Sequence, residues 1–301
     1  MYQVMQNNQV MAQEDLYTRF ISYLDNAPKT VETYKKNIKH LMDFLSSRGI
    51  TQPQRGDILA YKEELISRGL KPSTIQAYIT ATKIFFKWTA SEGLYPNIAD
   101  NIKGAKLNRD HKKDYLTGSQ VKAVLATAGN KRDYAILALM VTGGLRDIEV
   151  SRANIEDLRT LGDSTVLYIQ GKGKQEKTDY IKISEPVERA IREYLSSRGN
   201  TTGTKPLFTS TSNNSKGGRL STRTISGIAK QAMRQAGYNS ERLTAHSLRH
   251  TAVTLSLLAG ETLEAVQQFA RHANISTTMI YNHALDKSKN TCSQSVSNYI
   301  F

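Results

Sequence analysis

The sequence lacks the features that mark several common classes of protein. It has one cysteine, Cys292, among 301 residues, which excludes an internal disulfide framework and a zinc or iron–sulfur site built from cysteines. No apolar run approaches the roughly 18 residues of a membrane-spanning helix, and the first residues have no basic region followed by an apolar stretch, as a secretory signal would. We therefore expect a cytoplasmic protein that does not enter a membrane.

Acidic residues are also scarce relative to basic ones. The chain has 41 Lys and Arg against 27 Asp and Glu, a formal net charge of +14, and this surplus favours a polyanionic partner. Its hydrophobic content of 39% is enough to build cores, and its length suits two ordinary domains or one large one.

The pattern along the chain predicts a mainly α fold with a small antiparallel sheet, in two domains. Residues 1–11 are expected to form a tail and residues 12–101 a four-helix unit. Three of its helices are expected to begin at polar residues, namely Thr30, Asp57 and Ser73. They are expected to end at glycines, namely Gly49, Gly69 and Gly93.

A basic linker, residues 102–114, is expected to join this unit to a second one at 115–301. Thr117 and Gln120 form a capping-box pattern at the first helix of that unit. Extended stretches at 165–170 and 179–184 flank a tight turn and predict a hairpin. Helices are expected at 186–195, at 221–236 and from residue 245, with a C-terminal tail from about residue 286.

The turn between the two extended stretches reads GKGKQEKT. Its spacing fits neither a phosphate-cradling P-loop nor a dinucleotide fingerprint, because Glu176 stands where the third glycine would be. Two interpretations stay open, a solvated hairpin turn or a rigid turn whose lysine donates a proton or contacts a phosphate.

The segment HSLRH places His246 and Arg249 on one helix face. A zinc site with His246 and His250 is disfavoured, because the segment lacks the glutamate of HExxH and any cysteine partner. An ordinary helix surface and an anion site, whose arginine fork matches phosphate oxygens, both remain.

Two further segments carry an arginine and a tyrosine. In TGGLRDIE a Gly-Gly break presents Arg146 at a helix start, where it either attracts an anion or pairs with Glu149. In RHANISTTMIYNH, His272 and Tyr281 lie nine residues apart, across a turn expected to cap the next helix at Ser276 or Thr277. Each segment alone is also explained by ordinary packing. Together they suit metal-free phosphoryl transfer, with a set of six residues: Arg146, Lys172, His246, Arg249, His272 and Tyr281.

These four motifs, in this order, resemble the tyrosine recombinase (phage integrase) family over nearly the whole chain. The resemblance implies an N-terminal core-binding, SAM-like helical domain and a C-terminal catalytic domain. Two departures stand out: Gly143 and Gly144 precede Leu145 where the family often has Thr-Gly, and Arg271 precedes His272 where the family usually has glycine. Arg271 is thus an additional candidate for a phosphate contact.

The resemblance implies that Tyr281 attacks a DNA phosphate, giving a 3′-phosphotyrosine and a 5′-hydroxyl without ATP, metal or other cofactor. Arg146 and Arg249 would hold the non-bridging oxygens, and His272 would donate a further hydrogen bond. Lys172 would be the general acid for the leaving oxygen and His246 an acid/base or phosphate contact. Glu149 would orient Arg146.

The expected partner is double-stranded DNA, bound by a homotetramer. The strand exchange that it carries out is expected to pass through a Holliday junction intermediate. The apolar end of the C-terminal tail is expected to dock into a neighbouring subunit, and an accessory or excision factor is a further candidate partner. Candidate DNA contacts are Lys83, Lys87, Lys103, Lys106, Lys112, Lys113, Lys174, Arg223, Lys230, Arg234 and Arg271. Such a protein would lie in the bacterial cytoplasm, associated with the nucleoid.

Several roles are open. The residues of the motifs HSLRHT and TGGLRDIE favour an integrase of a mobile element. The expected lack of an arm-binding domain is instead typical of Xer-type resolvases of chromosome or plasmid dimers. A DNA-binding regulator on a degenerate scaffold is disfavoured because all six positions are filled. A type IB topoisomerase, which shares the chemistry, would not need a specific site.

Overall fold

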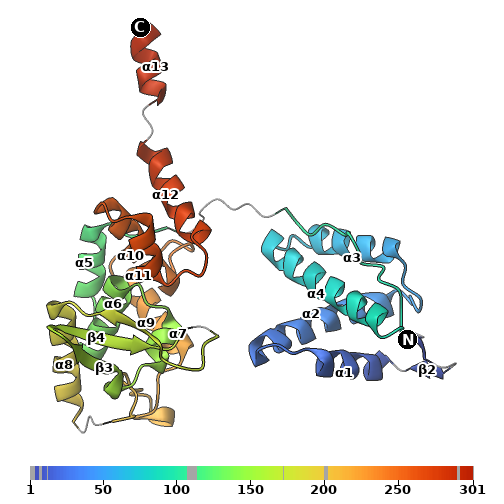
Figure 1. The fold of residues 1–301 in the computed structure, drawn as a ribbon, viewed down its shortest axis with the longest axis horizontal. Coiled ribbons are helices and arrows are strands. Elements are labelled where there is room, and N and C mark those ends of the chain that lie inside the picture. The colour runs from blue at the N-terminus through green and yellow to red at the C-terminus, as the bar shows by residue number, and fades with distance from the viewer. Residues whose placement is uncertain are drawn as a thin grey trace. The chain divides into compact units, whose positions relative to one another are not determined.

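The computed structural model describes residues 4–6, 9–11, 13–106, 114–171, 173–199, 203–289 and 292–300. The chain divides into two compact units, residues 1–109 and 110–301, and each is described by itself (Figure 1). Lys172 of the predicted catalytic set, and Lys112 and Lys113 of the predicted linker, lie outside the described residues.

Four helices form the first unit, as predicted: α1 (Gln13–Tyr23), α2 (Pro28–Ser47), α3 (Arg55–Ser67) and α4 (Pro72–Ser91). Their apolar faces meet in a core with aromatic residues at its centre, including Phe20, Tyr61, Phe85 and Trp88. Two short antiparallel strands that the sequence pattern did not predict, β1 (Val4–Gln6) and β2 (Gln9–Met11), precede the helices.

The predicted starts of three helices were wrong by one or two residues. Helices α2 and α4 begin at Pro28 and Pro72 rather than at Thr30 and Ser73, because proline suits the first helical position, where its missing N–H needs no partner. Helix α3 begins at Arg55, and Asp57 lies in its first turn, where its carboxylate accepts the backbone N–H of Gln54 at 2.7 Å.

The predicted helix ends at glycine are confirmed. Gly49, Gly69 and Gly93 each lie two residues after the last helical residue, and their φ angles are between +64° and +66°. Glycine adopts this left-handed conformation without steric cost, which is why it stops a helix cleanly.

The second unit combines helices with one small sheet. Its elements are α5 (Gly118–Ala126), α6 (Lys131–Gly143), α7 (Asp147–Arg152), a 3₁₀ turn η1 (Ile155–Asp157), β3 (Leu158–Leu161), β4 (Ser164–Ile169), β5 (Asp179–Lys182), α8 (Glu185–Arg198), a 3₁₀ turn η2 (Asn213–Ser215), α9 (Thr222–Gln235), α10 (Ala245–Leu258), α11 (Leu263–Ala270), α12 (Ser276–Lys289) and α13 (Cys292–Ile300). The predicted capping box is present, because the Thr117 side chain accepts from the backbone of Gln120 and Gln120 reciprocates.

The sheet has the order β3-β4-β5 and is antiparallel throughout. The predicted hairpin is confirmed, with Ile169 opposite Asp179 where the turn begins. The third strand, β3, was not predicted; its Leu158 pairs with Leu167 of β4.

A Gly-Gly break after α6 brings the functional segment into place. A side chain on Gly143 would approach the Cδ1 of Ile181 on β5 to 2.5 Å, so glycine allows the helix end and the sheet to touch. Gly144 has a φ of +57° and turns the chain away from the helix axis toward Leu145 and Arg146. In the part of the chain that the structure describes, no helix is long and apolar enough to cross a membrane.

Candidate active site

Glu149, on the first turn of α7, is the negative centre of the candidate site. Its side chain is fully buried, with Oε1 2.7 Å from Nη1 of Arg146 and Oε2 2.9 Å from the backbone nitrogen of Arg146. Burial alone would raise the pKa of Glu149, but the charge of Arg271 and the hydrogen bonds and charge of Arg146 outweigh it and hold that pKa below its usual value. The predicted pairing of Arg146 with Glu149 is confirmed, and a quarter of the arginine side chain is exposed.

Arg249, on α10, is buried beside this pair with 1% of its surface exposed. Its Nη1 donates to the carbonyl of Gly144 at 2.6 Å, and its Nη2 donates to the carbonyl of Ala270. Burial, reinforced by the positive charges of Arg146 and Arg271, lowers the pKa of Arg249 to about 9. The guanidinium therefore stays cationic at neutral pH, although desolvation makes its charge costly.

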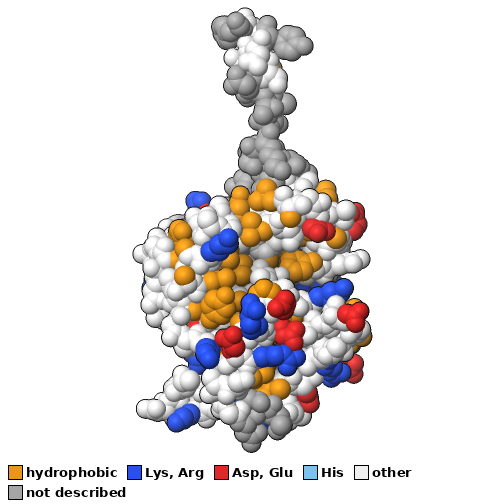
Figure 2. All heavy atoms as spheres, turned by 90° about the vertical axis from the view of Figure 1, so that its left-hand side faces the viewer, with side chains coloured by type: hydrophobic (Ala, Val, Ile, Leu, Met, Phe, Trp, Pro, Cys, Tyr) orange, Lys and Arg blue, Asp and Glu red, His pale blue; other side chains and the backbone are white. Residues whose placement is uncertain are grey.

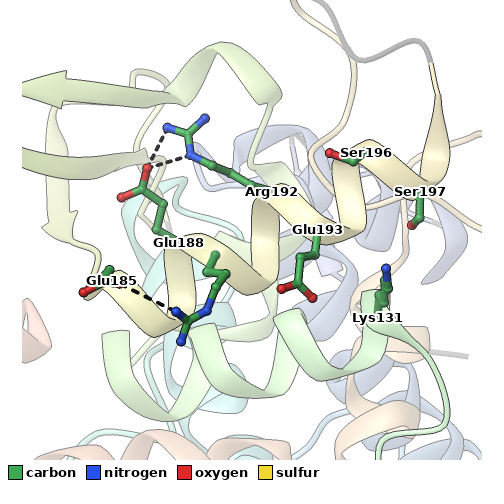
Figure 3. Close-up of a pocket in the computed structure, with 8 residues that line it drawn as sticks. Lys131, Glu185, Glu188, Arg192, Glu193, Ser196 and Ser197 are labelled. Atoms are coloured by element: carbon green, nitrogen blue, oxygen red, sulfur yellow. Dashed lines mark hydrogen bonds and ion pairs between the residues drawn. The ribbon is translucent and has the colours of Figure 1, made fainter.

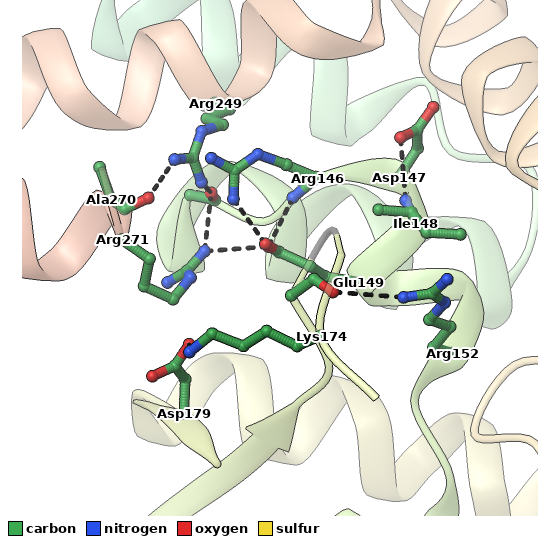
Figure 4. Close-up of polar contacts among 12 residues, drawn as sticks. Arg146, Asp147, Ile148, Glu149, Arg152, Lys174, Asp179, Arg249, Ala270 and Arg271 are labelled. Carbon is green, nitrogen blue, oxygen red and sulfur yellow. Dashed lines mark hydrogen bonds and ion pairs between the residues drawn. The ribbon is translucent and has the colours of Figure 1, made fainter. Parts of the chain in front are cut away.

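Arg271 brings a third guanidinium to the same place (Figure 4). It ends α11 in the left-handed conformation, with φ +53° and ψ +46°. Its Nη2 lies 3.0 Å from Oε2 of Glu149 and 3.2 Å from the carbonyl of Gly144, while its Nη1 donates to the carbonyl of Phe269 at 2.7 Å. Its Nε is buried and has no hydrogen-bond partner among the described residues.

Tyr281, on α12, lies on the other side of the site and is 5% exposed. Its ring packs against Val253, Val266 and Ala270, and its hydroxyl is hydrogen-bonded to Nδ1 of His250. Burial raises the pKa of Tyr281 to about 12, although the charges of Arg249 and Arg146 act to lower it.

His250 is a site residue that the sequence reasoning did not include among the six. The only signal was its place in HSLRH, four residues after His246, and there it was weighed only as a zinc ligand. Its ring lies edge-on to that of His246, with centroids 4.6 Å apart, and 5.1 Å from that of Tyr281.

His272 lies between the two sides of the site. Its Nδ1 is 2.9 Å from Oγ1 of Thr278, and its ring stacks on Tyr281 with centroids 6.3 Å apart. Burial, followed by the charge of Arg249 and its neighbours, lowers the pKa of His272 to about 4, so the ring is neutral at pH 7. His246 is more exposed than His272.

The turn before α12 differs from the predicted one. The side chain of Asn274 accepts the backbone N–H of Ser276 at 2.9 Å, so Asn274, rather than Ser276 or Thr277, supplies the polar cap. This turn carries the chain from His272 to the helix of Tyr281.

The lysine-bearing turn is described on either side of Lys172. The carbonyl of Gly171 accepts from Nη1 of Arg152 at 3.2 Å, and Lys174 is exposed and pairs with Asp179 at 2.8 Å. Figure 4 shows Lys174 below Arg271, on the side of the cluster that the hairpin approaches. Across the described ranges, no group of three or more His, Cys, Asp or Glu side chains could hold a metal ion.

The remaining DNA-contact candidates that the structure describes lie on surfaces. Arg223, Lys230 and Arg234 are exposed along one face of α9, whose opposite face is buried in the core. In the first unit, Lys87 of α4 is exposed and Lys83 half-buried, while the two lysines after that unit's core, Lys103 and Lys106, are exposed.

Other surfaces of the second unit carry both basic and acidic side chains. In the face shown in Figure 2, Lys and Arg side chains alternate with Asp and Glu, so the positive surplus is not concentrated there. A hollow along α8 is likewise lined by both signs of charge, with Arg192 paired to Glu188 at 2.6 Å and Arg189 to Glu185 at 3.6 Å (Figure 3). Neither surface offers a strongly positive groove.

Comparison with known families identifies the chain's relatives. Residues 114–288, more than half of the chain, match the model of the phage integrase family, and residues 16–94 match the phage integrase N-terminal SAM-like domain. The chain belongs to the phage integrase family of tyrosine recombinases. Tyrosine recombinases cut and rejoin DNA at specific sites, and the arginine, histidine and tyrosine cluster lies within the part that matches the family model.

Two curated relatives of this recombinase are similar over nearly their whole length. The tyrosine recombinase XerA of Pyrococcus horikoshii is 30% identical over 283 residues, covering 94% of both chains. The tyrosine recombinase XerC of Thermodesulfovibrio yellowstonii is 27% identical, covering 88% of this chain and 90% of the relative.

Solved structures share the fold. A XerH recombinase bound to a palindromic difH substrate in a post-cleavage complex matches with a TM-score of 0.74 and 21% identity, covering 97% of this chain and 86% of that one. A lambda integrase dimer bound to a COC′ core site matches with a TM-score of 0.72 and 18% identity, covering 89% and 97%. The predicted mainly α fold with a small antiparallel sheet is confirmed.

Proposed function

We propose that this recombinase cuts duplex DNA by attack of the Tyr281 oxygen on one backbone phosphate. The observation that carries the proposal is the convergence of Arg146, Arg249, His272 and Tyr281, from three separate segments, on one site. The new bond joins the tyrosine oxygen to phosphorus, the bond to the 5′-oxygen breaks, and that oxygen leaves as a hydroxyl. The ester retains the energy of the broken bond, so a second 5′-hydroxyl reverses the step without ATP.

The two arginines are assigned to the phosphate. Arg146 and Arg249 would donate to the non-bridging oxygens, whose charge grows in the transition state. His272, neutral at pH 7, would donate one further hydrogen bond without adding charge. Resemblance to the family assigns Lys172 the proton for the leaving oxygen and His246 an acid/base or phosphate role.

We assign Tyr281 a resting state in which its hydroxyl and ring are buried. Its hydroxyl is bonded to His250 and its ring is packed on α10 and α11, so attack on a phosphate requires Tyr281 to leave His250. We infer that His250 is a positioning residue that holds the nucleophile in this covered place until DNA is bound.

The test is a covalent adduct. Wild-type protein incubated with DNA and denatured with detergent should carry a labelled strand on a gel, and Tyr281→Phe should carry none. A matched control is Tyr180→Phe, which alters an exposed tyrosine on the sheet and should leave the adduct intact. An adduct with Tyr281→Phe would refute the assignment of the nucleophile.

We further propose assembly into a tetramer through the C-terminal tail. The last helix, α13, exposes 57% of Val296 and 66% of Ile300, an apolar pair at helical spacing on an otherwise polar segment. One of the solved structures with this fold is a lambda integrase tetramer bound to a Holliday junction. Val296→Asp together with Ile300→Asp should abolish tetramers on synthetic junctions in light scattering, whereas a tail that packs on its own subunit would leave them unchanged.

For the biological role we propose integration and excision of a mobile element. The residues of the motifs HSLRHT and TGGLRDIE support this role, while the similarity to XerA and XerC makes resolution of chromosome or plasmid dimers the second candidate. The genomic neighbourhood tests the choice: flanking direct repeats and transfer or excision genes are expected, and a gene far from any element would favour the resolvase. Relaxation of supercoiled plasmid without a specific site would instead indicate a topoisomerase, and binding without cutting would indicate a regulator.

A further inference from the structure

Arg271 has a backbone conformation that arginine seldom adopts. Among the described residues only Asn101 and Arg271 have a positive φ without being glycine. Asparagine tolerates the left-handed region, whereas arginine is strained there by its Cβ. Glycine would take the same conformation without strain. An arginine at this position therefore implies that contacts of its side chain offset the free-energy cost of the backbone conformation.

The contacts of the Arg271 side chain show what that is. The guanidinium is directed inward, with 11% of the side chain exposed, and its terminal nitrogens lie on Glu149, Gly144 and Phe269 oxygens. The terminal nitrogens are thus already hydrogen-bonded to protein oxygens, and the charged partner among these three is the carboxylate of Glu149.

The charges of the cluster explain why that carboxylate needs a second cation. Arg146, Arg249 and Arg271 contribute three positive charges and Glu149 one negative charge, so the cluster has a net charge of 3 − 1 = +2. Without Arg271 the net charge is +1, and among the described residues Glu149 is then paired directly with the side chain of Arg146 alone. A DNA phosphodiester carries a single negative charge, which increases when the tyrosine oxygen adds to phosphorus.

We propose that Arg271 is a positioning residue that neutralises Glu149 and thereby leaves the charge of Arg146 to act on the scissile phosphate. The inference rests on the proposed phosphate-binding role of Arg146 and Arg249. It also assigns Arg271 a different role from the direct phosphate contact that the sequence suggested.

A double-mutant cycle between Arg271 and Glu149 tests the proposal. The rate of adduct formation is measured in a single turnover on a nicked duplex that carries the site selected by the wild-type protein from random-sequence DNA. In the wild-type background R271G should lower this rate about tenfold, whereas in the E149Q background the same substitution should lower it less than about threefold, because residues in contact are energetically coupled. An equal loss in both backgrounds would overturn the proposal and would favour a direct contact between Arg271 and the phosphate.

Rescue by charge is the second arm of the test. R271K keeps the cation near Glu149 but not the planar fork, and it should recover at least half of the loss on a logarithmic scale. A rate for R271K as low as that of R271G would overturn the argument from charge.

Controls separate this role from folding and from the proposed function. R271G should unfold within about 4 °C of the wild type, because relief of backbone strain offsets part of the lost contacts. If R271G loses cooperative unfolding, R271Q replaces it in the cycle. N101G alters the other non-glycine residue with a positive φ and R189A removes an exposed arginine from α8, and neither should change the rate. An adduct that persists in Tyr281→Phe would refute the proposed function whatever the cycle shows.

Discussion

The two sides of the active site are built differently. On the arginine side, Glu149 holds two guanidinium groups, and Arg249 is fixed by main-chain carbonyls, all without DNA. On the tyrosine side, Tyr281 is covered and its hydroxyl is bonded to His250. Under the proposed function, the difference means that the groups assigned to the phosphate are preorganised, whereas the tyrosine assigned as nucleophile is covered until it moves.

The largest effect on the rate of adduct formation, among the changes that compare these two sides, is expected for substitution of Arg249. Arg249→Ala should lower the rate of adduct formation by about 10²–10³-fold, because a preorganised donor to the transition state is lost. The same change should also lower the melting temperature more than Arg146→Ala does. It leaves the buried carbonyls of Gly144 and Ala270 without this donor, at a cost of about 1–3 kcal/mol.

Single-turnover adduct assays and thermal unfolding of both variants check this prediction. Equal melting temperatures for Arg249→Ala and Arg146→Ala would contradict the view that Arg249 is also part of the buried framework.

The next effect concerns the covered tyrosine. His250→Ala should raise the rate at which tetranitromethane nitrates Tyr281 several-fold, because the hydroxyl loses its hydrogen-bond partner. Mass spectrometry of the peptides measures the rate, with the exposed Tyr180 as the internal reference. Unchanged nitration of Tyr281 would show that packing on α10 and α11 alone keeps it covered.

His272, between the two sides, should give a dependence of stability on pH. Its folded pKa of about 4 lies below the usual value of 6.5, so the folded protein binds fewer protons than the unfolded chain between these values. The free energy of unfolding should therefore fall as the pH falls from 6.5 to 4. His272→Gln should reduce this slope by at most about one proton. Denaturant titrations at several pH values measure the slope, and an identical slope in the variant would place the ring in solvent.

The smallest effect is expected from exposed cations, which contrast with the buried ones. Arg223→Ala and Lys230→Ala should each weaken DNA binding and reduce the salt dependence of the affinity by about 0.9 in log–log slope, if each residue contacts one phosphate. Fluorescence anisotropy at several salt concentrations measures both quantities. Arg189→Ala, in the mixed-charge surface of α8, is the matched control.

Some elements of the fold could be predicted from the sequence and others could not. Helix ends at glycines, the hairpin and the capping box at Thr117 follow from local conformational preferences, which a short segment carries by itself. Strand β3 was missed because three of its four residues are exposed, so no alternation of apolar and polar residues marks it. The helix starts were misplaced where a proline competed with a polar cap.

For the site, the prediction of the arginines, histidines and tyrosine rested on the residue types and their order and on the family resemblance, and four of them lie together in the structure. Two contacts were not predictable from any single segment. The bond between His250 and Tyr281 joins residues 31 apart, and that between Arg271 and Glu149 joins residues 122 apart. Both depend on how α7, α10, α11 and α12 pack, and the second depends in addition on a left-handed arginine that local preference disfavours.

The carbonyl of Gly144 accepts hydrogen bonds from both Arg249 and Arg271, which lie 105 and 127 residues further along the chain. The arginine cluster therefore exists only after segments of the second unit that are far apart in the sequence have come together. A chain that ends before Arg271, or one in which these segments have separated, cannot form both contacts. Under the proposed function, the ability to cleave DNA therefore arises only with the completed tertiary structure.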